Sequence, residues 1–172
     1  MSDAIGRFAV DGNTLDFNSV DPNSYHASVI IDFLRRRLLD AETTFTVETV
    51  MSHPSKVAWL EEAQSRNWRT YLYYIATDDP EICVARVRHR VAVGGHDVPE
   101  GKIAERYRRS LDQLYSAIRH TNRAFIFDNS ATTVAQQKWI AEVTDGRHLE
   151  LKVTEVPAWF QEAVLDRVNG SS

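Results

Sequence analysis

Residues 83–114 read CVARVRHRVAVGGHDVPEGKIAERYRRSLDQL, and this stretch predicts two helices joined by one tight turn. Valines at three- and four-residue spacing give the first helix one apolar face, and these are Val84, Val87 and Val91. The pair Gly94-Gly95 then ends the helix, because glycine adopts left-handed backbone conformations without a steric cost. The second helix has a regular core face, formed by Ile103, Tyr107, Leu111, Leu114 and Ile118.

Start signals for the second helix follow the glycine pair. Asp97 is a candidate N-cap, and Pro99 falls in the first turn. Glu100 stands three residues after Asp97, which is the spacing of a capping box. We therefore expect this helix to begin directly after Asp97.

Arginines crowd both helices next to the turn. Arg86 and Arg90 share one edge of the first helix, and Arg106 and Arg109 share one edge of the second. Residues 81–109 carry a net charge of +3 in a chain whose net charge is −4. This pattern favours a small anionic partner over nucleic acid. Guanidinium groups also grip phosphate through two parallel hydrogen bonds. In the alternative interpretation, these arginines lie on solvated helix faces and pair with Glu81, Glu105 or Asp112.

The rest of the chain alternates between strand-like and helix-like segments. Strands are expected at 43–50, 69–76, 124–128 and 148–155, and helices at 23–40, 52–67, 131–143 and 157–168, with Ser52 capping the second of these helices. Such alternation predicts an α/β fold with a parallel sheet. The strand at 69–76 is almost wholly apolar, which is typical of a strand covered on both faces. We expect residues 1–22 to be an irregular segment and residues 23–172 to form one domain.

Composition limits the location and the chemistry. The 172-residue chain has one cysteine, Cys83, which excludes an internal disulfide and is compatible with a reducing compartment. Neither a signal peptide nor a membrane-spanning apolar run is recognisable, so we expect a cytoplasmic protein that does not enter a membrane. The six histidines show no metal-ligand spacing, so no metal site is predicted.

Ligands of open parallel sheets bind beyond the carboxyl ends of the strands. That rule selects Glu48 and Thr49, then Thr77 and Asp78, then Asp128 and Asn129. Glu48 closes an otherwise uncharged strand, so it needs a partner or a ligand, and a helix cap or an ion pair with an arginine would satisfy it equally. For Asp128 and Asn129 the alternative is simple turn formation.

Three separated blocks resemble the zeta-toxin-like group of P-loop kinases. They are FTVETVMSHPSK, RVRHRVAVGGHDVPEGKIAERYRRSL and RAFIFDNS, and the similarity extends from about Tyr25 to Ser130. The resemblance implies a parallel, three-layer P-loop-kinase-like sheet with an arginine-rich helical lid. It also implies transfer of a phosphoryl group from ATP, with Mg²⁺, to a small hydroxyl acceptor such as a nucleotide-sugar, and an antitoxin protein as a possible partner.

The resemblance assigns roles to individual residues. Arg90, Arg106 and Arg109 would act catalytically, by stabilising charge on the transferring phosphoryl group. Arg86, Arg90, Asp128 and Asn129 would contact the nucleotide. Glu48 and Thr49 would lie on the acceptor side with His96, for which a hydrogen bond within the turn is the alternative.

The phosphate-binding loop of such kinases has no counterpart here. The motif is G-x-x-x-x-G-K-[ST], whereas the nearest stretch, Gly6 to Thr14, reads GRFAVDGNT, and Gly101-Lys102 is followed by Ile103. The strand that feeds the loop would lie between the predicted strands 43–50 and 69–76, so we expect that central strand to be missing and their edges to be unpaired. The chain is then a C-terminal portion of such a kinase. In the alternative it is an inactive remnant, or a module that binds an antitoxin or the missing N-terminal fragment.

Overall fold

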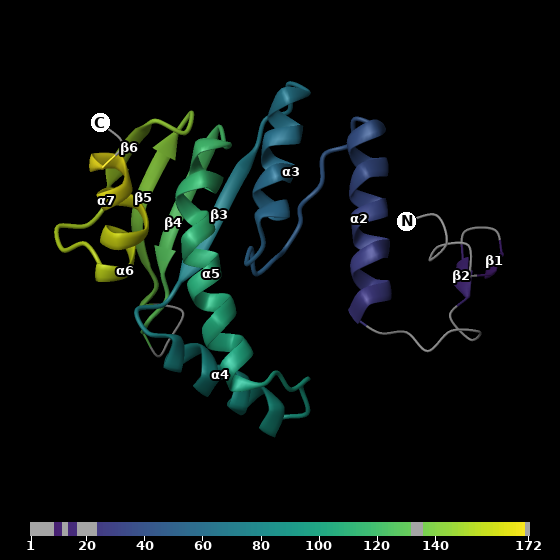
Figure 1. Cartoon of the computed structure of the whole chain (residues 1–172), viewed down its shortest axis with the longest axis horizontal. Helices are drawn as coiled ribbons and strands as arrows, with labels where there is room; N and C mark the ends of the chain where they lie inside the picture. The colour runs from purple at the N-terminus through teal and green to yellow at the C-terminus, as the bar shows by residue number, and fades with distance from the viewer. Residues whose placement is uncertain (1–8, 12–13, 17–23, 132–135, 171–172) are drawn as a thin grey trace. The chain divides into compact units, whose positions relative to one another are not determined.

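The computed structural model describes residues 9–11, 14–16, 24–131 and 136–170 (Figure 1). These residues form two compact units, Met1–Glu48 and Thr49–Ser172. The chain is a mixed α/β protein, as its sequence pattern predicts, and its larger sheet is open.

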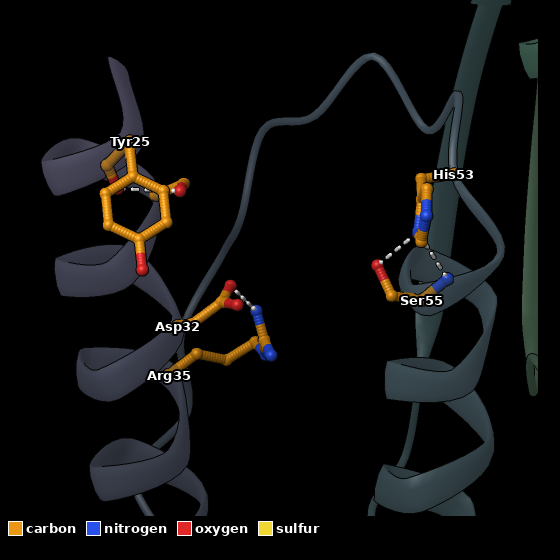
Figure 2. Close-up of polar contacts among 6 residues, drawn as sticks. Tyr25, Asp32, Arg35, His53 and Ser55 are labelled. Carbon is orange, nitrogen blue, oxygen red and sulfur yellow. Dashed lines mark hydrogen bonds and ion pairs between the residues drawn. The ribbon is translucent and has the colours of Figure 1, made fainter. Parts of the chain in front are cut away.

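The first unit contains a short antiparallel ladder and one long helix. Strands β1 (Ala9–Asp11) and β2 (Thr14–Asp16) pair with each other inside the segment that was expected to be irregular. Helix α2 (Ser24–Asp40) confirms the helix predicted at 23–40. On α2, the guanidinium of Arg35 donates to Asp32 over 3.1 Å, one turn earlier in the helix (Figure 2).

The strand predicted at 43–50 does not form. Residues 43–50 have no regular secondary structure, and all of them except Phe45 are exposed. An alternating pattern makes a strand only when a neighbouring strand takes up its backbone N–H and C=O groups. No strand of the described part of the chain pairs with this segment. This prediction is therefore wrong: the sequence pattern is typical of a strand, but the described residues offer no partner strand.

The second unit is built on a four-stranded sheet in the order β3-β4-β5-β6. The strands are β3 (Tyr71–Ala76), β4 (Arg123–Asp128), β5 (Lys138–Thr144) and β6 (His148–Leu151). Only β3 and β4 are parallel, and the other two pairs are antiparallel, so the sheet is mixed instead of wholly parallel.

Strand β5 occupies the second half of the segment where a helix was expected, residues 131–143. Residues 132–135 of that segment lie outside the described residues, but from Lys138 to Thr144 the chain is a strand. The cause is the turn that follows, because Asp145 and Gly146 both have positive φ angles and begin the three-residue loop 145–147 that joins β5 to β6. That hairpin turns β6 back along β5, with Thr144 opposite His148.

The other helices predicted for the second unit are present. They are α3 (Pro54–Ser65), α4 (Pro80–Ala92), α5 (Glu100–Arg119), α6 (Ala158–Phe160), the π-helical turn η2 (Gln161–Leu165) and α7 (Asp166–Asn169). Two predicted caps are wrong. Helix α3 is capped by His53, whose Nδ1 accepts from the Ser55 N–H, and not by Ser52 (Figure 2). Helix α5 begins after Pro99, which makes no side-chain cap, and not after Asp97.

The core lies on one face of the sheet. Leu114 from α5, Ile126 from β4 and Phe160 from α6 have no exposed surface, and they belong to one apolar cluster. On β3, by contrast, Tyr71, Tyr73 and Ile75 are 47%, 66% and 57% exposed. Alternate residues of a strand point to opposite faces, so β3 is covered on one face only, and the expectation of two covered faces is wrong.

Candidate functional site

The carboxyl ends of β3 and β4 are tied together. The Asn129 N–H donates to the Ala76 carbonyl over 2.8 Å, and the Asp78 N–H donates to the Ser130 hydroxyl over 2.7 Å. The segments that leave the two strands are therefore held side by side by hydrogen bonds that cross between them. This brings together two of the three strand ends that sequence analysis selected as candidate ligand sites.

Asp128 is a buried anchor of this strand end. One of its carboxylate oxygens accepts from the Ser130 N–H over 2.9 Å, and the other accepts from Nε1 of Trp159 over 2.7 Å. The first contact is the turn that the alternative interpretation of Asp128 predicts. Because both oxygens already accept strong hydrogen bonds, this carboxylate fixes the C-terminal helix to the end of β4.

Helix α4 begins directly beyond β3. The Asp79 carboxylate caps it by accepting from the Glu81 N–H over 2.8 Å, and Pro80 occupies the first helical position. Just before the start of α4, the Thr77 carbonyl accepts a hydrogen bond of 2.8 Å from the Tyr107 hydroxyl. Burial, together with smaller contributions from nearby Cys83 and Asp78, raises the pKa of Tyr107 to about 12. A neutral phenol from α5 thus holds the loop between β3 and α4.

Arg86 connects α4 to the segment that follows β4. Its Nη2 donates to the carbonyls of Asn129 over 2.7 Å and Ala131 over 3.0 Å. A guanidinium has five N–H donors, and both of these bonds use the same nitrogen. The structure therefore brings Arg86 and Asn129 into contact, and the Nε and Nη1 donors of Arg86 make no hydrogen bond within the described residues.

Arg90 closes the turn between α4 and α5. Its Nη2 donates to the His96 carbonyl over 3.0 Å, while the Gly95 N–H donates to the Arg90 carbonyl over 2.8 Å. Gly94 has a φ of 94°, and a Cβ on Gly95 would lie 2.5 Å from the Arg90 Cγ. The glycine pair therefore ends α4 as predicted, and the missing Cβ of Gly95 lets the turn pack closely against Arg90. His96 contributes its backbone carbonyl to this turn, and its side chain is exposed.

Arg88, which sequence analysis did not single out, braces the two helices. It donates to Oε1 of Glu100 from Nε over 2.7 Å and from Nη2 over 2.6 Å. Helix α4, the turn and the first half of α5 together form residues 80–109, which we call the arginine hairpin. The two helices are thus joined next to the turn by the Arg88–Glu100 pair, and the turn itself is closed by Arg90.

Arg106 and Arg109 lie on the exposed side of α5. Arg109 pairs with Glu105 over 3.5 Å, which is one of the solvated pairings predicted in the alternative interpretation. Asp112 pairs with Arg167 of α7 instead of an arginine of the hairpin. Arg106 is exposed and makes no ion pair with any residue that the structure describes. Such exposed pairs contribute little to stability, so these side chains can exchange partners.

Glu48 and Thr49 lie at the division between the two units. Glu48 is the last residue of the first unit and is exposed. Thr49 begins the second unit, and its hydroxyl accepts from the Met51 N–H over 3.2 Å. An acceptor-binding role for these two residues remains a prediction.

Trp159 and Ser130 belong to the strand end but were missed by sequence reasoning. A buried indole N–H needs an acceptor, which is a usable signal for Trp159. Its acceptor, however, is 31 residues earlier in the chain, and no sequence spacing links the two. Ser130 follows Asp128 by two residues, and this spacing is that of an Asx-turn.

The residues at this edge fit an anion better than a metal ion. Arg86, Arg90 and Arg106 have N–H donors without a partner among the described residues, whereas both carboxylate oxygens of Asp128 have one. Across the described ranges, no three His, Cys, Asp or Glu side chains lie close enough to hold a metal ion. Of the helices in those ranges, none has the length and apolarity to cross a membrane. Comparison of the chain with protein-family models, curated proteins and solved structures finds no match.

Proposed function

We propose that this chain is the lid and acceptor side of a zeta-toxin-like kinase, and that the arginine hairpin binds the phosphates of ATP. The observation that carries the proposal is the position of Arg86. From α4, its guanidinium reaches the backbone that leaves β4, so a cationic side chain lies at the carboxyl ends of two parallel strands. This is the edge where α/β sheets bind ligands.

The hairpin is pre-organised for an anion. Arg86 and Arg90 are held by Nη2 alone, which keeps their side chains in place while other N–H groups stay available. Arg106 can add a third positive charge, because it is not committed to a described carboxylate. Such charges stabilise a transferring phosphoryl group when they are fixed before the reaction.

Phosphoryl transfer by this chain would still require a phosphate-binding loop. In the proposed enzyme, another polypeptide segment supplies that loop and the central strand, and Mg²⁺ binds together with the nucleotide. The four-stranded sheet, the hairpin and the strand ends would then form one side of a parallel, three-layer kinase fold. The chain alone is expected to bind ATP weakly and to transfer no phosphoryl group.

Calorimetric titration of the full chain with ATP and Mg²⁺ tests the proposal. We expect measurable binding by the wild type and a loss of about tenfold or more in affinity in the double variant Arg90→Ala/Arg106→Ala, since charge-assisted contacts to phosphate are strong. Arg108→Ala is the matched control, because Arg108 lies on the same helix and makes no ion pair among the described residues. Equal affinities of all three proteins, or no binding by the wild type, would refute the proposal.

The open edge of β3 favours a second candidate, a module that binds a partner strand. The Thr70 and Ala76 carbonyls accept from Arg123 and Asn129, so even-numbered residues of β3 direct their backbone groups toward β4. The N–H and C=O groups of Tyr71, Tyr73 and Ile75 therefore face the other way, where no described strand pairs with them. Neither charge nor proline protects this edge.

A separate kinase fragment that carries the phosphate-binding loop, or an antitoxin, would supply the strand that pairs with this edge. Residue-resolved hydrogen exchange of the isolated chain tests the open edge directly. We expect fast exchange of the Tyr73 and Ile75 amides and slow exchange of the Leu72 and Tyr74 amides, which lie on the same strand. Equal protection of the odd and even amides would mean that the edge is already paired, and this candidate would then be abandoned.

A further inference from the structure

A hollow lies at the end of the sheet opposite the arginine hairpin, at the amino ends of β3 and β4. The hairpin turn between β5 and β6 folds against the last turn of α5. Gly146 has a φ of 62°, and a Cβ there would lie 2.6 Å from the Arg119 carbonyl oxygen. The Asp145 N–H also donates to the Asn122 carbonyl over 2.8 Å. This close approach places Arg147, the next residue of the hairpin, beside Arg119.

The two arginines line two adjoining cavities. One cavity, of about 430 Å³, is polar and is completed by Gln64, Asn122, Asp145 and His148. The other, of about 260 Å³, is mainly apolar, and its walls include Tyr115, Ile118, Val143, Leu149 and Val168. Arg119 and Arg147 belong to the lining of both cavities, so they stand at the boundary between a polar and an apolar space.

The polar wall is held rigidly. The Thr70 N–H donates to the Asn122 side chain over 2.8 Å, and the Thr70 hydroxyl donates to the His120 carbonyl over 3.2 Å. Gln64 joins the same group by donating to the Thr70 hydroxyl over 3.3 Å. These bonds connect the end of α3, the start of β3 and the start of β4, so the cavity wall does not depend on a ligand for its shape.

The charge of the site favours an anion. Within the described residues, neither Arg119 nor Arg147 forms an ion pair, and Arg119 makes only one weak contact, from Nη1 to the Tyr115 hydroxyl over 3.4 Å. Asp145 is the one acidic side chain in the lining of either cavity. Two guanidinium groups against one carboxylate leave a net positive charge, which suits an oxyanion.

We propose that this hollow binds a small amphiphilic anion, namely a phosphate monoester with a compact apolar group. The phosphate would lie between Arg119 and Arg147, and the apolar group would enter the cavity next to Val168. A cavity of about 150 Å³ already accommodates benzene in a protein core, so the 260 Å³ cavity has room for a phenyl ring. This site is separate from the arginine hairpin and goes beyond the proposed kinase function.

Titrations of the full chain with phenyl phosphate, inorganic phosphate and benzyl alcohol test the two parts of the site. We expect phenyl phosphate to bind about tenfold or more tightly than inorganic phosphate, because burying the ring adds apolar contact. Benzyl alcohol, which lacks the anion, is expected not to bind measurably. Comparable affinity for phenyl phosphate and inorganic phosphate would overturn the proposal, and so would the absence of phenyl phosphate binding.

Variants separate this site from general electrostatic attraction and from the arginine hairpin. Arg119→Gln and Arg147→Gln are each expected to weaken phenyl phosphate binding about tenfold, while Arg108→Gln, which removes the same charge from α5, leaves it unchanged. Arg90→Ala/Arg106→Ala should also leave it unchanged, so failure here is distinguishable from failure of the kinase proposal. Equal losses in Arg108→Gln and Arg147→Gln would contradict a defined site.

Val168→Thr tests the apolar cavity without changing any charge. Val168 is 46% exposed, so the added hydroxyl is expected to leave folding intact, which a thermal unfolding curve checks. The variant should bind inorganic phosphate as the wild type does but phenyl phosphate about threefold more weakly, because the hydroxyl brings water into the cavity. An unchanged ratio of the two affinities would place the ring elsewhere and refute the proposal.

Discussion

The two ends of the four-stranded sheet use arginine in different ways. At the carboxyl ends of β3 and β4, Arg86 already donates to backbone carbonyls, and Arg90 does so in the turn of the arginine hairpin. At the amino ends, Arg119 and Arg147 line cavities and pair with no described carboxylate. A positive charge alone therefore does not identify a binding site, because an arginine can either stabilise the fold through hydrogen bonds or remain available to bind a ligand. The predictions below test which role each end has.

The stability of the carboxyl ends of β3 and β4 should depend most on Asp128. Replacing it with alanine leaves the buried Trp159 N–H and the Ser130 N–H without their acceptor. We expect Asp128→Ala to lower the free energy of unfolding by about 3 kcal/mol, measured by urea denaturation. Asp128→Asn, which keeps one acceptor oxygen, should lose less. A loss below about 1 kcal/mol for the alanine variant would show that this carboxylate does not anchor the strand end.

The stability of the structure at the amino ends of β3 and β4 should depend on Gly146. Gly146→Ala introduces both a strained positive φ and a clash with the Arg119 backbone, and we expect a loss of about 2 kcal/mol. Gly94→Ala is its counterpart in the arginine hairpin, where φ is also positive but no atom lies within 4 Å of the added Cβ. Its loss should be about 1 kcal/mol, from strain alone. Thermal unfolding of both variants would contradict the account if Gly94→Ala were the more damaging.

Stability should also depend on pH through Tyr107, which holds the loop at the carboxyl end. Burial raises its pKa from 10.0 to about 12, so the folded state favours the neutral phenol. That contribution is fully present below pH 10 and is lost as the pH rises toward 12. Two pKa units correspond to about 2.7 kcal/mol, but the half-exposed ring is partly screened by solvent, so we expect about 1 kcal/mol.

The comparison that isolates this effect uses Tyr107→Phe, which cannot ionise. Its free energy of unfolding should fall less between pH 10 and pH 12 than that of the wild type, and the difference between the two curves gives the contribution of Tyr107. Parallel curves would mean that the hydroxyl of Tyr107 is not protected in the folded chain.

The smallest effect is expected at Arg86. Arg86→Met removes two exposed hydrogen bonds to carbonyls and keeps most of the aliphatic stem, so the loss of stability should be about 0.5 kcal/mol. Urea denaturation measures it. A loss above about 3 kcal/mol would show that Arg86 mainly stabilises the fold, and its proposed role in binding phosphate would lose its basis.

The helices of this protein were largely predictable from sequence. The arginine hairpin follows from local signals, since the valine spacing, the glycine pair and the core stripe of α5 each act within a few residues. Buried Val84, Ile103, Leu114 and Ile118 all belong to the predicted stripes. Local periodicity identifies such faces because a helix satisfies its own backbone.

The sheet was less predictable, because strands depend on distant partners. The segment at 43–50 has the alternation of a strand but remains unpaired, while 138–144 forms a strand in a region expected to be helical. The deciding feature for the second was the Asp145-Gly146 turn, which is a recognisable hairpin signal. Whether residues 43–50 pair with another strand depends on the rest of the chain, so the sequence of this segment alone does not predict it.

The candidate site was predictable only in part. The strand-end rule selected Asp128 and Asn129, and the structure brings them together with Arg86. The rule does not predict that Trp159 donates a hydrogen bond to the Asp128 carboxylate. It also does not predict that Arg119 and Arg147 line the same cavity at the amino ends of β3 and β4. These contacts join residues from different elements, and their geometry exists only once the fold is formed.

The central claim, that the arginine hairpin binds ATP phosphates, is tested most directly by nuclear magnetic resonance of the arginine Nε–H groups during titration with ATP and Mg²⁺. The account predicts shifts for Arg86, Arg90 and Arg106, with Arg119 and Arg147 unchanged. Shifts confined to Arg119 and Arg147, or uniform small shifts of all exposed arginines, would contradict it.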